Sequence, residues 1–309
     1  MRSVLLLFWE WFEMSSGASS KLRGIGITLS FIGPILILYA IFFIVPLGGS
    51  LLYSFTDWDG LQNSFNWVGF RNYADLLLHS GEFRDSFLFT LQFSALNIVL
   101  VNVFGVLLAL LVDSKLKSKY ALRVVFFSPN VISLIVVGFL WKFVFSSVFY
   151  ELGTKLGWNF LTYSFLGNPD HILYPIAGVS LWSSVGLAMV IYLAGLQGIP
   201  GELKEAMHVD GAGSWTRFWK MTLPLLMPAI VSNVFLTTTN SFKVFDLILA
   251  LTGGGPANSS QSLAINIYRE AFTANSYGSG TARSIVFCLF IVIVMLIQFR
   301  VLRNKEVSA

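Results

Sequence analysis

The stretch EAMHVDGAGSWTRFWKMTLP, residues 205–224, is a polar, charge-bearing segment between two long apolar runs at 173–197 and 225–251. An acidic residue at its start favours a short helix, because carboxylates stabilise the first turns of a helix. Gly211 permits a sharp bend, and Ser214 is of a residue type that caps a following helix. The stretch therefore predicts a helix–turn–helix elbow that lies at the surface of a membrane.

The composition of the chain indicates an integral membrane protein. Its 309 residues are 55% hydrophobic, 16% aromatic and only 12% charged, with a mean hydropathy of +0.73. This is too little charge to cover a soluble domain of that size. A helix needs roughly 20 apolar residues to cross a hydrocarbon core of about 30 Å. We expect an all-α protein with six such spans, at 27–52, 87–112, 123–146, 173–197, 225–251 and 284–302.

The distribution of cations predicts the orientation of these spans. With the N-terminus inside, 13 of the 20 Lys and Arg residues fall in inner segments, 5 fall in outer segments and 2 fall within spans. Cytoplasmic loops of membrane proteins carry such an excess. Both termini and the segment 198–224 are therefore expected to be cytoplasmic. The basic charge balance follows from this topology and does not indicate binding of nucleic acid.

The N-terminal segment 1–26 precedes the six-span domain at 27–302, and a short cytoplasmic tail follows at 303–309. Residues 4–12, VLLLFWEWF, are too few to span a membrane. We expect an interfacial helix there, with its tryptophans at headgroup depth; a disordered or cleaved leader is the alternative.

The elbow carries the pattern Glu-Ala-(x)4-Gly-(x)9-(apolar)-x-Leu-Pro. This pattern resembles the coupling loop of the membrane subunits of binding-protein-dependent ABC importers. Met207 stands where the family has a second small residue, and Met221 where it has a β-branched one. The matching positions are Glu205, Ala206, Gly211, Met221, Leu223 and Pro224.

In this family the loop docks into a groove on a separate ATPase subunit. The resemblance implies that Glu205 is the carboxylate that pairs with the ATPase, with Ala206 and Gly211 as positions of close approach. Met207 and Asp210 lie between them, and Leu223 and Pro224 form the entry to the next span. When ATP brings the two ATPases together, the docked loops move and the attached spans rock between inward-facing and outward-facing arrangements. The alternative is an unpartnered cytoplasmic loop whose glycines only make turns.

Four further segments are similar to the carbohydrate-uptake branch of these importers: SFTDWDG at 54–60, VGFRNY at 68–73, SFKVFDLILALTGGGP at 241–256 and YREAF at 268–272. The chain looks most like the first of the two permeases in maltose, lactose, multiple-sugar and glycerol-phosphate uptake. The resemblance implies a second, related permease subunit, two ATPase subunits and an extracytoplasmic sugar-binding protein. It also implies a location in the cytoplasmic (inner) membrane of a bacterium or archaeon, in contact with membrane lipid.

The fifth predicted span carries polar residues on one helical face, at Asn233, Thr237, Asn240 and Ser241. Amide and hydroxyl groups can satisfy the hydroxyls of a sugar; hydrogen bonding between helices is the alternative role. Trp182 could stack on a sugar ring or simply pack. By resemblance to the maltose-type permeases, the solute contacts fall on Thr237, Asn240, Ser241 and Val244 of this span and on Ser183, Ser184 and Leu187 of the preceding one.

The chain lacks a phosphate-binding Gly-(x)4-Gly-Lys-Ser/Thr loop and any nucleophile, base and orienting group in a recognisable pattern. We therefore expect no enzymatic activity and no cofactor on this chain, with ATP and magnesium on the partner ATPase. Cys288, the only cysteine, suggests packing inside the last span.

Lys243 and Asp246 are spaced so that they could pair with each other or with a neighbouring helix. An ion-coupled secondary sugar carrier could use such a pair and is the main rival hypothesis. That class needs inverted repeats within one chain, and the two halves of this sequence have no convincing similarity. A membrane receptor or structural subunit, the third hypothesis, would need no coupling loop.

Overall fold

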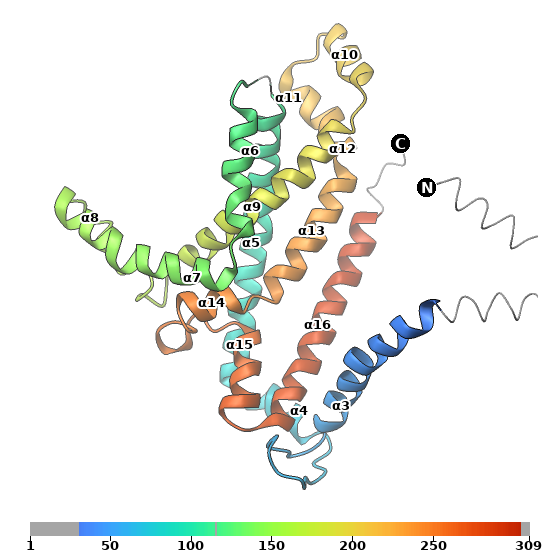
Figure 1. Ribbon diagram of the computed structural model, residues 1–309, viewed down its shortest axis with the longest axis vertical. Helices are drawn as coiled ribbons and strands as arrows, with labels where there is room; N and C mark the ends of the chain where they lie inside the picture. Colours follow the sequence, from blue (N-terminus) through green and yellow to red (C-terminus); the bar gives the residue numbers. More distant parts are fainter. Residues whose placement is uncertain (1–30, 115, 304–309) are drawn as a thin grey trace, which may run out of the picture.

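The computed structural model describes residues 31–114 and 116–303. These residues are mostly helical, and the part of the chain described contains no strand, only an isolated bridge between Thr56 and Trp67. The expected all-α membrane class is confirmed (Figure 1). The predicted interfacial helix at 4–12 lies outside the described residues.

The helices, in chain order, are α3 (Val45–Tyr53), α4 (Arg71–Leu78), α5 (Gly81–Asp113), α6 (Lys119–Phe127), α7 (Leu134–Phe143), α8 (Phe149–Leu156), α9 (Leu173–Gln197), α10 (Gly201–Val209), α11 (Ser214–Arg217), α12 (Leu223–Leu225), α13 (Met227–Phe242), α14 (Asp246–Leu251), α15 (Leu263–Tyr268) and α16 (Tyr277–Arg303). Short π-helical turns lie at Ala40–Ile44, Val144–Val148, Phe218–Thr222 and Arg269–Thr273, and 3-10 turns at Ser128–Val131 and Pro256–Asn258.

Five helices of the described chain are long and apolar enough to cross a membrane, or up to six if one bent pair is counted as a single span. Four of them overlap predicted spans closely: Phe31–Tyr53, Gly81–Asp113, Leu173–Gln197 and Tyr277–Leu302. The second and the last begin six or seven residues before the predicted positions, because helical turns bearing Arg84 and Arg283 precede the apolar core. Ser80 caps α5 by accepting a hydrogen bond from the Phe83 amide at 3.2 Å.

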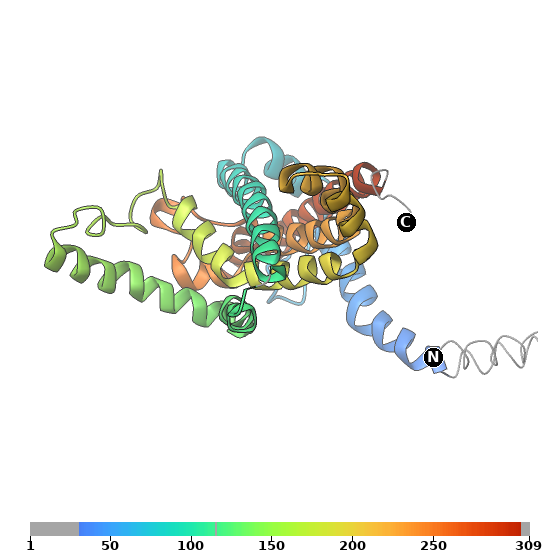
Figure 2. The same cartoon turned by 90° about the horizontal axis from the view of Figure 1, so that it is seen from above.

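The third span was predicted wrongly. A single helix over 123–146 does not exist, because Pro129 lacks an amide hydrogen and the chain forms a 3-10 turn at Ser128–Val131 before α7 begins. The long apolar helix instead runs over Leu134–Leu156 and projects sideways from the body of the molecule (Figures 1 and 2).

The fifth span, predicted over 225–251, is also not one helix. The segment Ser214–Leu225 meets α13 at an angle of 67°, and α13 ends at Phe242. Val244 and Phe245 are not helical, and the chain resumes as α14, which packs against α7. Irregular backbone among apolar helices is tolerated where protein or a cavity surrounds it.

Helix α5 packs along α9, and small residues set their separation. A Cβ atom placed on Gly105 would lie 2.8 Å from the Cβ of Ala188. On the next face of α9, a Cβ on Gly186 would lie 2.1 Å from the carbonyl oxygen of Phe126 in α6. Such close backbone approach is how helices associate in a membrane, where lipid is as apolar as the side chains.

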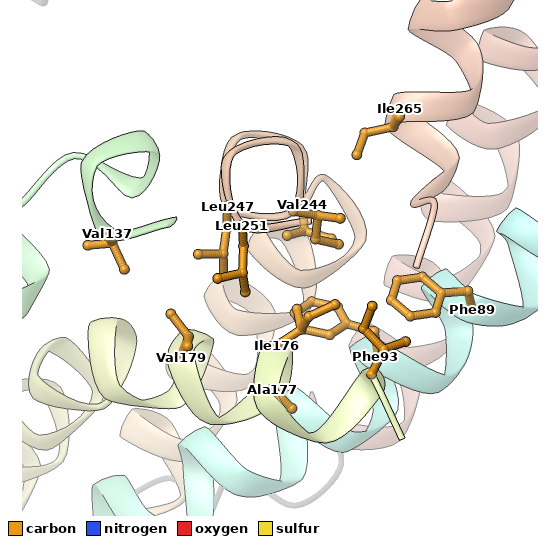
Figure 3. Packing of buried hydrophobic residues seen from close by; sticks show 12 residues of the cluster. Phe89, Phe93, Val137, Ile176, Ala177, Val179, Val244, Leu247, Leu251 and Ile265 are labelled. Atoms are coloured by element: carbon orange, nitrogen blue, oxygen red, sulfur yellow. The ribbon is translucent and has the colours of Figure 1, made fainter. Parts of the chain in front are cut away.

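One buried apolar cluster joins five helices, α5, α7, α9, α14 and α15. Figure 3 shows Phe93 of α5, Ile176 and Val179 of α9, Val137 of α7 and Leu247 of α14 converging there. At the two ends of the molecule, α4 lies opposite α10, and the described end of α16 points toward the α10 side (Figure 1). The cluster packs the first turns of α9, one of the helices that contribute the polar residues described next, against α5, α7 and α14.

Candidate functional site

The elbow forms a short helix that ends in a glycine turn. Helix α10 is closed by a hydrogen bond from the Ala212 amide to the Met207 carbonyl at 3.1 Å, and Gly211 has a φ of +70°. A left-handed glycine just after a helix with this bond is a Schellman cap. Ser214 does not cap the next helix as expected: the cap position is Gly213, and Ser214 is the first residue of α11.

The surface of the elbow is open. Glu205, Ala206, Asp210 and Gly211 are exposed, and Met207 is half-buried. Nothing lies within 4 Å of a Cβ built on Gly211. Glu205 forms no ion pair with any described residue, so its carboxylate is available to a partner.

Leu223 and Pro224 lie apart from this surface. They form α12, are half-buried and follow the π-helical turn Phe218–Thr222. Glu205, Ala206, Met207, Asp210 and Gly211 thus lie together in α10 and its glycine turn, four of them exposed. The Leu223-Pro224 pair lies immediately before the bend between Ser214–Leu225 and α13.

The elbow is tied to the helices on which it stands. Lys204 of α10 lies 4.0 Å from a carboxylate oxygen of Asp113 at the end of α5, and its ammonium donates to the carbonyl of Leu196 in α9 at 3.4 Å. Only three residues separate α9 from α10. A force applied to α10 therefore acts on α9 through a short connection.

A cavity of about 350 Å³ lies between α5, α9, the α13–α14 break and the turn before α7. This volume falls within the range of about 300–1,000 Å³ usual for small-molecule sites. All seven residues expected on the solute path line it: Ser183, Ser184, Leu187, Thr237, Asn240, Ser241 and Val244.

Some of the polar groups beside this cavity bond helices together. The Asn233 amide donates to the side-chain oxygen of Asn102 at 2.9 Å and to the Tyr192 hydroxyl at 3.1 Å. Asn233 is 1% exposed. The alternative role, hydrogen bonding between helices, is therefore the one observed at Asn233.

Ser241 and Asn240 differ, although they are neighbours. Ser241 is buried, and its hydroxyl accepts a hydrogen bond from Asn97 at 2.8 Å. Asn240 is exposed in the cavity and forms no side-chain hydrogen bond to a described residue. The Oδ1 atom of Asn97 is buried without a partner although its residue also lines the cavity. The sequence reasoning missed Asn97, whose only signal was an amide within an apolar span.

Lys243 and Asp246 both line the cavity and are exposed. They do not pair with each other or with any other charged residue that the structure describes, contrary to the expectation. The break between α13 and α14 separates the two residues and removes the helical spacing that would bring them together.

Trp182 and Cys288 do not belong to the cavity. Trp182 has a packing role, and Cys288 lies on the surface. Trp182 packs edge-on against Trp141, with ring centroids 5.6 Å apart, and does not line the cavity. Cys288 is exposed on the surface of α16 rather than packed within the protein.

Fold and site together define a helical, multi-pass membrane protein with a polar cavity among its spans and an exposed elbow at one end. The family model of the "Binding-protein-dependent transport system inner membrane component" matches residues 101–306. The chain belongs to this family of transport subunits, which are permeases rather than enzymes and have no known cofactor of their own.

Curated relatives extend the similarity over nearly the whole chain. The chain is 36% identical over 280 residues to the "Probable starch degradation products transport system permease protein AmyD" of Thermoanaerobacterium thermosulfurigenes, covering 90% of this chain and 94% of that protein. It is 35% identical over 307 residues to the "Multiple sugar-binding transport system permease protein MsmF" of Streptococcus mutans, covering 99% of each.

A solved structure shares the fold. A crystal structure of a bacterial alginate ABC transporter, in complex with an alginate pentasaccharide-bound periplasmic protein, contains a chain that superimposes with a TM-score of 0.82. The match has 21% sequence identity and covers 94% of this chain and 98% of that one.

Proposed function

We propose that this chain is one of two membrane subunits of an ATP-driven sugar importer in the cytoplasmic membrane of a bacterium or archaeon. It forms half of the translocation pathway and is driven by a separate ATPase. The relatives named for starch degradation products and for multiple sugars support a sugar as the solute.

One observation carries the proposal. The two helices that contribute most of the lining expected on the solute path, α9 and α13, are the same two helices that the elbow at 198–224 connects. A movement of α10 is transmitted to α9 directly and to α13 through the bent segment Ser214–Leu225. The same two helices, α9 and α13, thus line the solute cavity and receive the force applied at the elbow.

The proposed residue roles come from the family resemblance, and this arrangement is compatible with them. Glu205 pairs with a basic group on the ATPase, while Ala206, Met207, Asp210 and Gly211 form the docking edge. Asn240 and Thr237 offer hydrogen bonds to sugar hydroxyls, and Ser183, Ser184, Leu187, Ser241 and Val244 complete the wall. ATP and magnesium act on the ATPase, two copies of which complete the complex with a related second permease and an extracytoplasmic sugar-binding protein.

In this arrangement both termini and the elbow face the cytoplasm. The 13 inner cations support that orientation, and the placement of α10 and the described end of α16 on one side of the molecule agrees with it (Figure 1). An ion-coupled secondary carrier is the alternative. It rested on pairing of Lys243 with Asp246, and neither residue pairs within the described part of the chain.

Uptake of labelled oligosaccharides into proteoliposomes tests the proposal. The complete complex should import sugar only with ATP on the ATPase side and binding protein on the other, and ionophores should not reduce the rate. Uptake that follows an ion gradient without ATP would support the secondary carrier instead.

A further inference from the structure

A second hollow, separate from the polar cavity, lies under the elbow. It has a volume of about 510 Å³ and lies between the last turns of α5, the end of α9 and the segment Ser214–Thr222. We call it the elbow groove. Its walls are mainly apolar side chains: Leu107, Leu110, Leu196, Ile199, Phe218 and Met221.

The lining of the elbow groove also includes charged side chains. Lys204 and Arg217 line it, together with a single acidic residue, Asp113. Asp113 lies 4.0 Å from Lys204, which leaves Arg217 without an acidic partner among the described residues. The Arg217 guanidinium donates to the Ser214 hydroxyl at 3.2 Å, and its Nε atom is buried without a hydrogen-bond partner. The buried Nε atom is out of reach of a ligand, but the guanidinium as a whole has no acidic partner among the described residues and therefore favours an anionic one.

Aromatic side chains stand at the rim of the elbow groove. Trp215, one of the groove residues, is 74% exposed and its ring lies 5.6 Å from that of Trp219, which is also exposed. Exposed tryptophans next to the ends of apolar helices are typical of the boundary between hydrocarbon and headgroups. The π-helical turn Phe218–Thr222 directs Phe218 and Met221 into the groove beside them.

These features together describe an amphipathic ligand. Apolar walls at the ends of membrane helices suit an acyl chain, and a guanidinium in the lining with no acidic partner among the described residues suits a phosphodiester. Basic pockets between helices near the cytoplasmic surface recognise anionic lipid headgroups in this way. We propose that the elbow groove binds one anionic glycerophospholipid of the adjoining leaflet, with its phosphate on Arg217 and Lys204 and an acyl chain against Leu110 and Phe218.

A lipid in this site would add a further link among three elements, of which α5 and α9 already pack along each other. A lipid in the groove contacts α5, α9 and the bent segment at once, directly beneath α10. It would hold the base of the elbow against the two helices that reach the polar cavity. Its occupancy is independent of which solute the cavity accepts.

Native mass spectrometry of the complete transporter complex tests the proposal. The complex is released from bilayers containing equal amounts of phosphatidylglycerol and phosphatidylcholine, and the lipid that remains bound is identified. The wild-type complex should retain phosphatidylglycerol, and Arg217→Gln should reduce that retention at least fivefold. Lys220→Gln is the matched control, since Lys220 is an exposed neighbouring cation that does not line the groove, and its retention should stay within twofold of wild type.

Other outcomes would overturn it. Equal retention in Arg217→Gln and wild type, or equal retention of the two lipids, would mean that no anionic lipid occupies this site. Displacement of the lipid by millimolar inorganic phosphate would mean that the groove recognises only the phosphate group.

If Arg217→Gln fails to assemble, brominated lipids give a second measurement on the wild-type complex. Brominated phosphatidylglycerol should quench the fluorescence assigned to Trp215, taken as the difference from Trp215→Phe, more strongly than brominated phosphatidylcholine. Equal quenching by both lipids, or quenching by neither because the ATPase covers Trp215, would contradict the proposal.

Discussion

Replacing Asn240 and Asn233 separately by Leu should distinguish a residue on the solute path from one that holds helices together. The two side chains lie two turns apart on α13 and are chemically identical. Asn233 is buried and donates two hydrogen bonds, at 2.9 and 3.1 Å, whereas Asn240 is exposed in the cavity and forms none with the described residues. The same substitution should therefore have different consequences at the two positions.

The magnitudes follow from these contacts. Asn233→Leu removes two net hydrogen bonds of about 0.5–1.5 kcal/mol each, so the free energy of unfolding should fall by about 1–3 kcal/mol. For a chain of this size that corresponds to a melting temperature lowered by roughly 2–10 °C. Asn240→Leu should change stability by less than about 0.5 kcal/mol. Loss of one hydrogen bond to a desolvated sugar, about 1–2 kcal/mol, should reduce uptake roughly 5- to 30-fold.

The assay compares three quantities on purified complexes: melting temperature, basal ATP hydrolysis and binding-protein-dependent sugar uptake. Asn240→Leu should lower uptake alone, and Asn233→Leu should lower melting temperature and all activities together. If Asn240→Leu lowers the melting temperature and every activity in parallel, Asn240 is a packing residue and the assignment of the cavity is wrong.

Four further results are expected. Glu205→Lys should abolish co-purification of the ATPase and coupled uptake, because it places a cation against a basic groove at a cost of a few kcal/mol. Glu202→Lys on the same helix is the charge-matched control. Normal uptake in Glu205→Lys would refute the docking role. Gly211→Ala should lower the free energy of unfolding of the last turn of α10 by about 1–2 kcal/mol, because Gly211 has a φ of +70°; amide hydrogen exchange measures this. Gly211→Val should reduce coupling further only if the ATPase fills the open space around this residue. Gly186→Ala should destabilise the protein by about 1–3 kcal/mol, because the new Cβ would lie 2.1 Å from the Phe126 carbonyl oxygen, whereas Gly178→Ala, with nothing within 4 Å, should not lower the melting temperature. Hydrogen bonds from the backbone and side chain of Asn66 lower the pKa of Asp57 below its ordinary 3.8. The loop between α3 and α4 should therefore be most ordered above that value and become less ordered as the pH falls through the lowered pKa. Amide exchange in Asp57→Asn should lack that pH dependence.

The sequence predicted the helical membrane class and several spans because long apolar runs have one physical solution in lipid. It placed α9 at the correct residues, since Gly198 and Pro200 interrupt the apolar run directly after its end. The prediction of a single span at 123–146 was wrong, because hydropathy averaged over a window of residues is insensitive to one proline. Pro129 ends the helix and changes the direction of the chain without making the segment less apolar.

The candidate site was predictable to different degrees. The face of α13 that bears Thr237 and Asn240 could be derived from helical spacing, whereas Ser183 and Leu187 on α9 were placed only by resemblance. Spacing along one helix could not separate Asn240 from Asn233, because the difference depends on the partners Asn102 and Tyr192, which are distant in sequence. The elbow groove was missed for the same reason, since its residues come from three separate segments.

The central claim is that the polar cavity is a solute path whose exposure is set by the ATPase through the elbow. It is tested most directly by thiol labelling of Asn240→Cys in a Cys288→Ser background, since Cys288 is the only native cysteine. In the complete complex, the transported sugar should slow labelling by a membrane-impermeant reagent, and a non-hydrolysable ATP analogue should change the side of the membrane from which the thiol reacts. Labelling that neither sugar nor nucleotide affects, from either side, would contradict the account.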